Sequence, residues 1–235
     1  MPVGPSSIPT LRALFRTSVL KAVDQSQLRF QAKASLLDRV SLFQGDITEL
    51  EVDGIVNAAN RSLLGGGGVD GAIHAAAGPE LLEECRTLDG CDTGDAKMTK
   101  AYNLPSQHII HAVGPVYSRN HVETKASQLE SCYKRSLQIA ADNSLRHIAF
   151  PSISTGIYGY PIEDATHIAL STTRAFLDSP DGNNIEQVIF VVWSDKDKMV
   201  YERLIPSYFP SPSETEDAGD ARVIDTIAQS DAQVL

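Results

Sequence analysis

Four consecutive glycines at positions 65–68 constrain this sequence more than any other feature. The apolar residues 54–56 lead toward them, and a helical pattern over residues 69–77 follows. A strand, a glycine loop and a helix in this order present backbone N–H groups and a helix N-terminus to an anion. The sequence therefore predicts an anion-binding loop, although glycines alone serve any tight turn.

Polar residues flank the glycine loop on both sides. Asn57 and Asn60 precede it, and Asp70 and His74 follow it with the i, i+4 spacing that places two side chains on one helix face. We expect these side chains to converge on whatever the loop binds. The alternative is a flexible loop with a solvated aspartate and a buried histidine.

Strand-like and helical patterns alternate along most of the chain. We expect strands at residues 40–44, 52–58, 97–104, 108–113, 147–151 and 187–193, and helices at residues 69–77, 79–87, 123–143, 162–177 and 196–205. This alternation is typical of an α/β layered domain with a central sheet. A second glycine-bearing loop at residues 152–161 also follows a strand. Ligands of such sheets bind where loops leave the carboxyl ends of the strands, so the two loops are expected to line one cleft.

Charge and cysteine content narrow the function classes. A formal net charge of −10 over 235 residues argues against a general electrostatic nucleic-acid binder. The cysteines Cys85, Cys91 and Cys132 are too few for a disulfide framework and lack the spacing of a zinc site. No apolar run approaches the ~20 residues needed to cross a bilayer, and the N-terminus lacks the apolar stretch of a secretory signal. We predict an intracellular protein with reduced thiols, no membrane association and no bound metal.

The two ends of the chain differ in composition from the domain that we expect at residues 40–210. Residues 10–37, within an N-terminal segment of 1–39, have loosely helical apolar spacing and are basic, with Asp24 as the one acid. A mitochondrial transit peptide shares that character, but we interpret the segment as a helical extension that packs on the domain. Residues 211–235 carry six acids against one arginine, which predicts an acidic, disordered tail.

Six motifs occur along the chain in a fixed order. They are G-D-I-T (45–48), V-N-A-A-N (56–60), G-G-G-G-V-D-G-A-I-H (65–74), T-G-D-A-K (93–97), H-A-V-G-P (111–115) and P-S-I-S-T-G-I-Y-G-Y-P (151–161). Together they closely resemble the macrodomain family, and within it the MacroD-type ADP-ribosylhydrolases. The resemblance implies a three-layer α/β/α sandwich around a mixed, mostly parallel six-stranded sheet. Ala75 and Ala101 depart from residues common in the family, but neither falls on a position that carries chemistry.

The resemblance also implies that ADP-ribose binds in a cleft at the crest of the sheet. Asp46 would accept a hydrogen bond from the adenine amine beside the backbone N–H of Ile47, although Asp46 could instead support the turn alone. Tyr158 would pack against the distal ribose. The diphosphate would bind between backbone N–H groups of two loops, comprising Gly67, Gly68, Val69 and Gly71 on one side and Ser154, Thr155, Gly156, Ile157 and Tyr158 on the other.

The resembling enzymes hydrolyse the ester between C1″ of ADP-ribose and an aspartyl or glutamyl side chain, and they deacetylate O-acetyl-ADP-ribose. On that basis Asn60 and Asp70 are the predicted catalytic pair at the distal ribose, with His74 in support and Asn57 as a structural turn residue. Asp70 would act either as a general base or by positioning a water that a ligand phosphate activates. The alternative function is a non-catalytic ADP-ribose reader, because the same cleft can bind without turnover.

Further expectations concern partners and location. The partners would be ADP-ribose and mono-ADP-ribosylated proteins, and no cofactor would be needed. We expect a monomer in the cytoplasm or nucleus, with mitochondria left open by the basic N-terminus.

Overall fold

The computed structural model describes residues 1–212, so nearly all of the predicted acidic tail at 211–235 lies outside the described residues. Within them, six strands form one sheet in the order β1-β6-β5-β2-β4-β3. The strands are β1 (Val40–Gln44), β2 (Gly54–Ala59), β3 (Ala96–Lys100), β4 (His108–Val113), β5 (His147–Pro151) and β6 (Gln187–Val192). β3 pairs antiparallel with β4, and the other pairs are parallel. The predicted mixed, mostly parallel sheet is confirmed.

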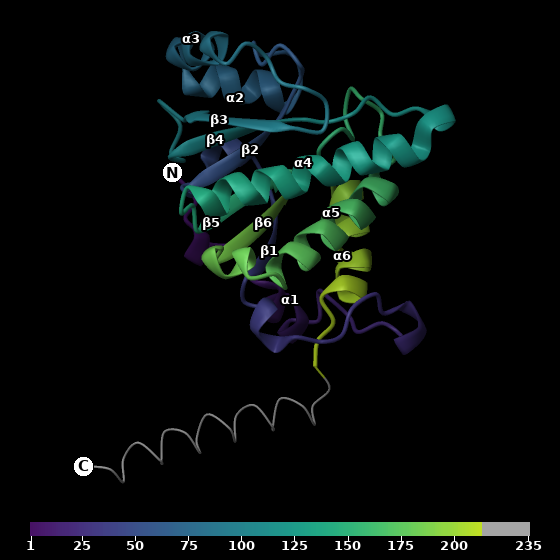
Figure 1. Cartoon of the computed structure of the whole chain (residues 1–235). Coiled ribbons are helices and arrows are strands. Elements are labelled where there is room, and N and C mark those ends of the chain that lie inside the picture. Colours follow the sequence, from purple (N-terminus) through teal and green to yellow (C-terminus); the bar gives the residue numbers. More distant parts are fainter. Residues whose placement is uncertain (213–235) are drawn as a thin grey trace, which may run out of the picture.

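Helices cover both faces of the sheet. They are α1 (Leu11–Arg16), α2 (Val69–Ala77), α3 (Pro79–Thr87), α4 (Val122–Asp142), α5 (Ile162–Leu177) and α6 (Asp195–Tyr208). Figure 1 shows how these helices are arranged around the strands. Side chains from α1, α4, α5 and α6 share one apolar core with the sheet, and those from α2 and α3 share a second core. Parallel strands need crossover connections, which place helices on both faces of the sheet. The α/β/α sandwich confirms the predicted fold class.

The strand β6 shows why an apolar run folds at the centre of this sandwich. All of its residues are buried. Val188 and Phe190 enter the core beneath α4, α5 and α6, whereas Ile189 and Val191 enter the core beneath α2 and α3. Successive side chains of a strand point to opposite faces, so a strand covered on both sides is mostly apolar.

The N-terminal segment packs on the sheet, but less of it is helical than its spacing suggests. Leu11, Leu20 and Leu36 are buried in the core that α4 and α5 cover. The helix α1 spans six residues, and Ser18 follows it with φ 59°, a left-handed conformation that ends the helix. The rest of the segment is irregular apart from short 3₁₀ turns.

The strand predicted at 97–104 is shorter in the structure. β3 ends at Lys100, and Tyr102 then adopts φ 55°, so residues 101–107 form a turn into β4. Ala101 is buried inside that turn. Among the described residues, every helix is too short or too polar to cross a membrane.

Candidate active site

Two adjoining cavities lie at the carboxyl ends of the parallel strands. The first has a volume of ≈ 250 Å³ and is lined by residues at or after the ends of β2, β4 and β5. The second has a volume of ≈ 440 Å³ and is lined by residues at or after the ends of β1, β5 and β6. Gly68, Val69, Ser152 and Gly156 line both, so the cavities are one cleft with a first lobe and a second lobe. Both glycine-bearing loops line this cleft, as predicted.

The glycine loop between β2 and α2 forms one wall of the cleft. Gly65 and Gly68 have φ of 84° and 63°, a left-handed backbone that favours glycine. Gly68 is also the N-cap of α2, and no side chain caps this helix. The first N–H groups of α2 are therefore free to bind an anion, and the helix dipole favours one. The residues that line the two lobes include neither lysine nor arginine, so backbone amides would carry this role.

The second loop, between β5 and α5, forms the opposite wall. Ser154 is buried with φ 66°, and its Oγ has no hydrogen-bond partner among the described residues. Such strained non-glycine conformations cluster at functional sites. Ile157 is 77% exposed and reaches across the cleft, because a Cβ on Gly67 would lie 3.0 Å from its Cδ1. Tyr158 lines the first lobe, and its carbonyl accepts a hydrogen bond from the Tyr117 N–H.

Three side chains meet at the floor of the first lobe. Asp70 lines the lobe although only 3% of it is exposed. Asn60 Nδ2 lies 3.4 Å from Asp70 Oδ2 and donates to the Gly65 carbonyl at 2.8 Å, so the predicted catalytic pair is together. Asn57 is fully buried in β2 and donates from Nδ2 to Asp70 Oδ1 at 2.7 Å. Asn57 therefore holds the carboxylate, a contact beyond the turn role expected from the sequence.

The environment of Asp70 favours proton acceptance. Burial raises its pKa above the ordinary value, while the Asn57 hydrogen bond and the nearby His74 partly oppose the rise. A carboxylate with a raised pKa holds a proton more readily, which suits a general base. His74 lies behind Asp70 rather than in either lobe, with Nε2 3.6 Å from Asp70 Oδ1 and no hydrogen-bond partner among the described residues. His74 is thus close to the carboxylate, but its Nε2 makes no hydrogen bond to it.

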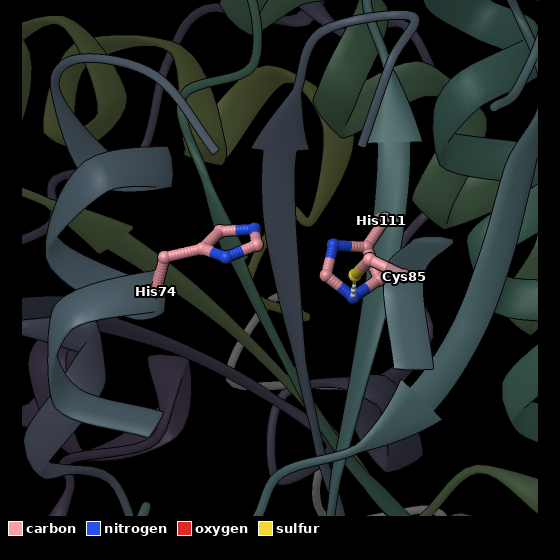
Figure 2. A group of neighbouring side chains, drawn as sticks. All are labelled: His74, Cys85 and His111. Carbon is pink, nitrogen blue, oxygen red and sulfur yellow. Dashed lines mark hydrogen bonds between the residues drawn. The ribbon is translucent and has the colours of Figure 1, made fainter. Parts of the chain in front are cut away.

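Residues that could hold a metal lie behind the cleft. Within residues 1–212, His74, Cys85 and His111 offer ligand atoms within 4.8 Å of one another. Figure 2 shows the two imidazoles turned toward each other from α2 and β4, with Cys85 beside His111. His111 Nε2 is 2.9 Å from Thr99 Oγ1 and 3.7 Å from Cys85 Sγ, and Nδ1 is 3.1 Å from the Asn57 amide. Hydrogen bonds already engage both ring nitrogens, and burial raises the pKa of Cys85 to about 11, so the group fits a polar core better than a metal site.

The second lobe contains the predicted adenine-binding residues. Asp46 and Ile47 both line it, at the turn after β1. Asp46 Oδ1 accepts hydrogen bonds from the Thr48 N–H at 2.9 Å and the Thr48 hydroxyl at 2.7 Å. Asp46 thus makes the turn-supporting bond that was the alternative to ligand binding, and it also faces the lobe. The two roles are compatible, because both bonds involve Oδ1.

Two residues outside the predicted set line the cleft, and one predicted residue does not. Trp193, the one tryptophan in the chain, is 75% exposed and lines the second lobe. Gly114 lines the first lobe and packs closely against Ser154. Both directly follow strands that end at the cleft, which is the signal that could have identified them. Gly71, predicted to bind the diphosphate, lines neither lobe; a Cβ there would lie 2.5 Å from the Gly66 carbonyl oxygen, so Gly71 lets α2 pack against the glycine loop.

Comparisons with known proteins agree with this geometry. The model of the Macro domain family matches residues 56–169, which include both glycine-bearing loops. The ADP-ribose glycohydrolase MACROD2 of Xenopus laevis is 48% identical over 218 residues, covering 92% of this chain and 51% of the relative. The ADP-ribose glycohydrolase MACROD1 of Rattus norvegicus is 48% identical over 182 residues, covering 77% of this chain and 70% of the relative. The chain thus spans about half the length of the MACROD2 relative.

A solved structure with a bound nucleotide resembles the whole fold. The crystal structure of the Trypanosoma brucei macrodomain in complex with ADP-ribose aligns with a TM-score of 0.71 and 39% sequence identity. The alignment covers 86% of this chain and 75% of that chain.

Proposed function

Because this chain belongs to the macro domain family, we propose that it is a hydrolase that removes mono-ADP-ribose from aspartate and glutamate side chains of proteins. The same cleft would also hold O-acetyl-ADP-ribose for deacetylation. The observation that carries the proposal is the two-lobed cleft, with Asn60 and Asp70 at one end and Asp46 at the other. A reader of ADP-ribose needs the cleft but has no need of a buried carboxylate at one end.

The cleft suits a ligand made of two nucleoside-like ends and a diphosphate. The larger second lobe would take adenosine, with Asp46 accepting from the adenine amine and Trp193 offering a flat apolar surface to the base. The uncapped N-terminus of α2 and the second loop, which meet between the lobes, would bind the diphosphate. The smaller first lobe would take the distal ribose, against Tyr158.

The reaction requires water to attack C1″ of the distal ribose. The C1″–oxygen bond breaks, the carboxylate of the modified protein leaves, and the water proton is released, giving ADP-ribose and an unmodified side chain. A carboxylate leaving group needs little protonation, so positioning the water and the ribose can supply most of the rate enhancement. Asp70, held by Asn57 and Asn60, would orient that water and accept its proton. General-base help of this kind contributes about 10²–10⁴-fold.

The test is incubation with a protein that is mono-ADP-ribosylated on glutamate and aspartate, with the wild-type chain beside Asp70→Ala. The wild-type chain should release ADP-ribose, and Asp70→Ala should slow release by about 10²-fold or more. Calorimetry with free ADP-ribose should show binding by both proteins, because the diphosphate contacts come from backbone amides.

Two outcomes would contradict the hydrolase proposal. If the wild-type chain binds ADP-ribose but releases none from the modified protein, the reader function is correct. If Asp70→Ala turns over at the wild-type rate, Asp70 is not the catalytic carboxylate and the assignment of the first lobe fails.

A further inference from the structure

A line of buried polar side chains runs from the catalytic aspartate into the sheet. It begins at Asp70 on α2, continues through Asn57 on β2 and His111 on β4, and ends at Thr99 on β3. All four are buried. Asn57 and His111 are opposite each other in the parallel pairing of β2 and β4. The line therefore crosses three adjacent strands on the face that α2 and α3 cover.

Only one assignment of hydrogen-bond donors and acceptors along this line is compatible with an ionised Asp70. The Asn57 Nδ2 group has two hydrogens, and its two neighbours are Asp70 Oδ1 at 2.7 Å and His111 Nδ1 at 3.1 Å. His111 Nδ1 must therefore accept, which places the ring proton on Nε2. That N–H has Thr99 Oγ1 as an acceptor at 2.9 Å.

The opposite orientation of the Asn57 amide is incompatible with an ionised Asp70. It would place the amide oxygen 2.7 Å from a carboxylate oxygen, and the amide NH₂ could no longer donate to either neighbour. That arrangement needs a proton on Asp70 and a second one on His111 Nδ1. A neutral imidazole that carries its proton on Nε2, with the Thr99 hydroxyl accepting from it, therefore matches the Asn57 orientation that stabilises the Asp70 carboxylate.

We propose that His111 and Thr99 are positioning residues of the hydrolase, which act through Asn57 to fix the orientation and the ionised state of Asp70. The inference rests on the proposed function, and neither residue lines the cleft. Burial supports it, because it lowers the pKa of His111 to about 3 and keeps the imidazole neutral, with Nδ1 free to accept. The other titratable groups near Asp70 are His74 on its own helix and Cys85 on α3.

The test compares four variants of the full chain: Thr99→Val, His111→Leu, His111→Gln and Cys85→Ala. Thr99→Val keeps the side-chain shape and removes the hydroxyl that is the hydrogen-bond partner of His111 Nε2. His111→Leu removes the acceptor for Asn57, whereas the glutamine carbonyl of His111→Gln can replace it. Cys85→Ala is the packing control, because Cys85 lies beside the same imidazole but outside the line to Asp70.

We expect His111→Leu to lower kcat by about tenfold or more with little change in KM, because an unpaired buried N–H would loosen Asp70. The acid limb of the kcat profile should move to higher pH, since an Asn57 amide that is held less firmly stabilises the Asp70 charge less well. Thr99→Val should shift the acid limb of the kcat profile in the same direction by a smaller amount. His111→Gln should recover much of the kcat that His111→Leu loses. Cys85→Ala should keep the wild-type profile.

A second measurement separates this inference from the proposed function. The carboxyl ¹³C signal of Asp70 in labelled protein reports its pKa without turnover, and that pKa should be higher in Thr99→Val than in Cys85→Ala. If the wild-type chain hydrolyses nothing but this difference is present, the proposed function fails and the positioning line stands. If the wild-type chain is active and Thr99→Val matches Cys85→Ala in Asp70 pKa and in kcat, the inference is wrong. Thr99→Val decides the question even if His111→Leu does not fold.

Discussion

Asp46 and Trp193 are the two residues on which the proposed base site in the second lobe rests. Asp46 uses Oδ1 for the turn after β1, which leaves Oδ2 for a donor on the ligand. Trp193 stays 75% exposed although it follows the buried strand β6. A large aromatic side chain without cover, at the rim of a cavity, gains apolar contact only when a ligand binds.

Replacing Trp193 with alanine should weaken ADP-ribose binding by about 1–3 kcal/mol, which is the range measured for loss of an aromatic–base stack. The free energy of unfolding should change little, because the side chain is exposed in the folded protein. Calorimetry compares the affinities of the wild-type chain and of Trp193→Ala for ADP-ribose and for ribose 5-phosphate, which lacks the base. Only the ligand that carries the base should lose affinity.

Met199→Ala is the control for that experiment. Met199 is 68% exposed on α6 and lies outside the lining of the second lobe. We expect it to bind ADP-ribose with wild-type affinity. Equal losses in the two variants would mean that Trp193 contributes general surface hydrophobicity rather than a contact with the base.

Spacing in the sequence predicts which residues approach one another, but it does not predict how a buried polar group is satisfied. The i, i+4 spacing places Asp70 and His74 on one face, yet the carboxylate bonds to Asn57 instead. The Asn57 amide also contacts His111, which the pairing of β2 with β4 brings beside it from 54 positions away along the chain. Trp193 was missed for a related reason, because its place at the cleft follows from the strand order of the sheet.

At the scale of elements, hydrophobic periodicity predicted the strands and helices of the central domain well. The predicted element boundaries are wrong where the backbone conformation of a single residue ends a strand or helix that the hydrophobic spacing would continue. Tyr102 with φ 55° ends the extended run that the apolar residues suggested for β3, and Ser18 with φ 59° interrupts the helical spacing of the N-terminal segment. A left-handed residue other than glycine is not visible in composition, because tertiary contacts impose it.

The ends of the strands opposite the cleft are tied together by Asp53, just before β2. Its Oδ2 accepts hydrogen bonds from the Arg146 N–H, the His147 N–H and the His147 Nδ1, and its Oδ1 accepts from the Gln107 side chain. Burial alone would raise the pKa of Asp53, but the hydrogen bonds from Arg146 and His147 and the nearby His147 ring outweigh it and lower the pKa below the ordinary value of 3.8.

Stability should therefore fall at acid pH in part through Asp53. A depressed pKa means that the folded state binds the proton less readily than the unfolded state, so the contribution is fully present above the ordinary value and is lost as pH falls through the folded pKa. We expect Asp53→Asn to reduce the free energy of unfolding by about 1–3 kcal/mol at pH 7, and by progressively less below about pH 4. Urea denaturation from pH 7 to pH 3 measures this difference.

Asp92→Asn is the matched control, because Asp92 forms an exposed ion pair with Arg61. Its effect should stay below about 1 kcal/mol at every pH. A difference between Asp53→Asn and the wild-type chain that stays constant down to pH 3 would show that the hydrogen bonds of Asp53 do not depend on its charge.

At the scale of the whole molecule, Arg174 on α5 joins the N-terminal segment to the end of α6. It is 4% exposed, and its guanidinium donates to the Gln31 carbonyl at 2.8 Å, the Tyr208 carbonyl at 2.7 Å and the Asp178 carboxylate at 2.7 Å. Lys33 also pairs with Asp178 at 2.9 Å. The N-terminal segment is thus held by polar contacts as well as by its buried leucines.

We expect Arg174→Met to lower the free energy of unfolding by about 3–5 kcal/mol, because methionine keeps the apolar stem but leaves buried acceptors unpaired. Arg135→Met removes an exposed pair with Asp95 and should cost less than about 1 kcal/mol. Proteolysis under native conditions should cut the N-terminal segment of Arg174→Met faster than that of Arg135→Met, since its anchor on α5 is lost. Equal stabilities, or equal cleavage of the segment, would show that the leucine contacts alone hold it. ADP-ribose should protect both variants against unfolding, because Arg174 and the residues it binds lie outside the cleft lining.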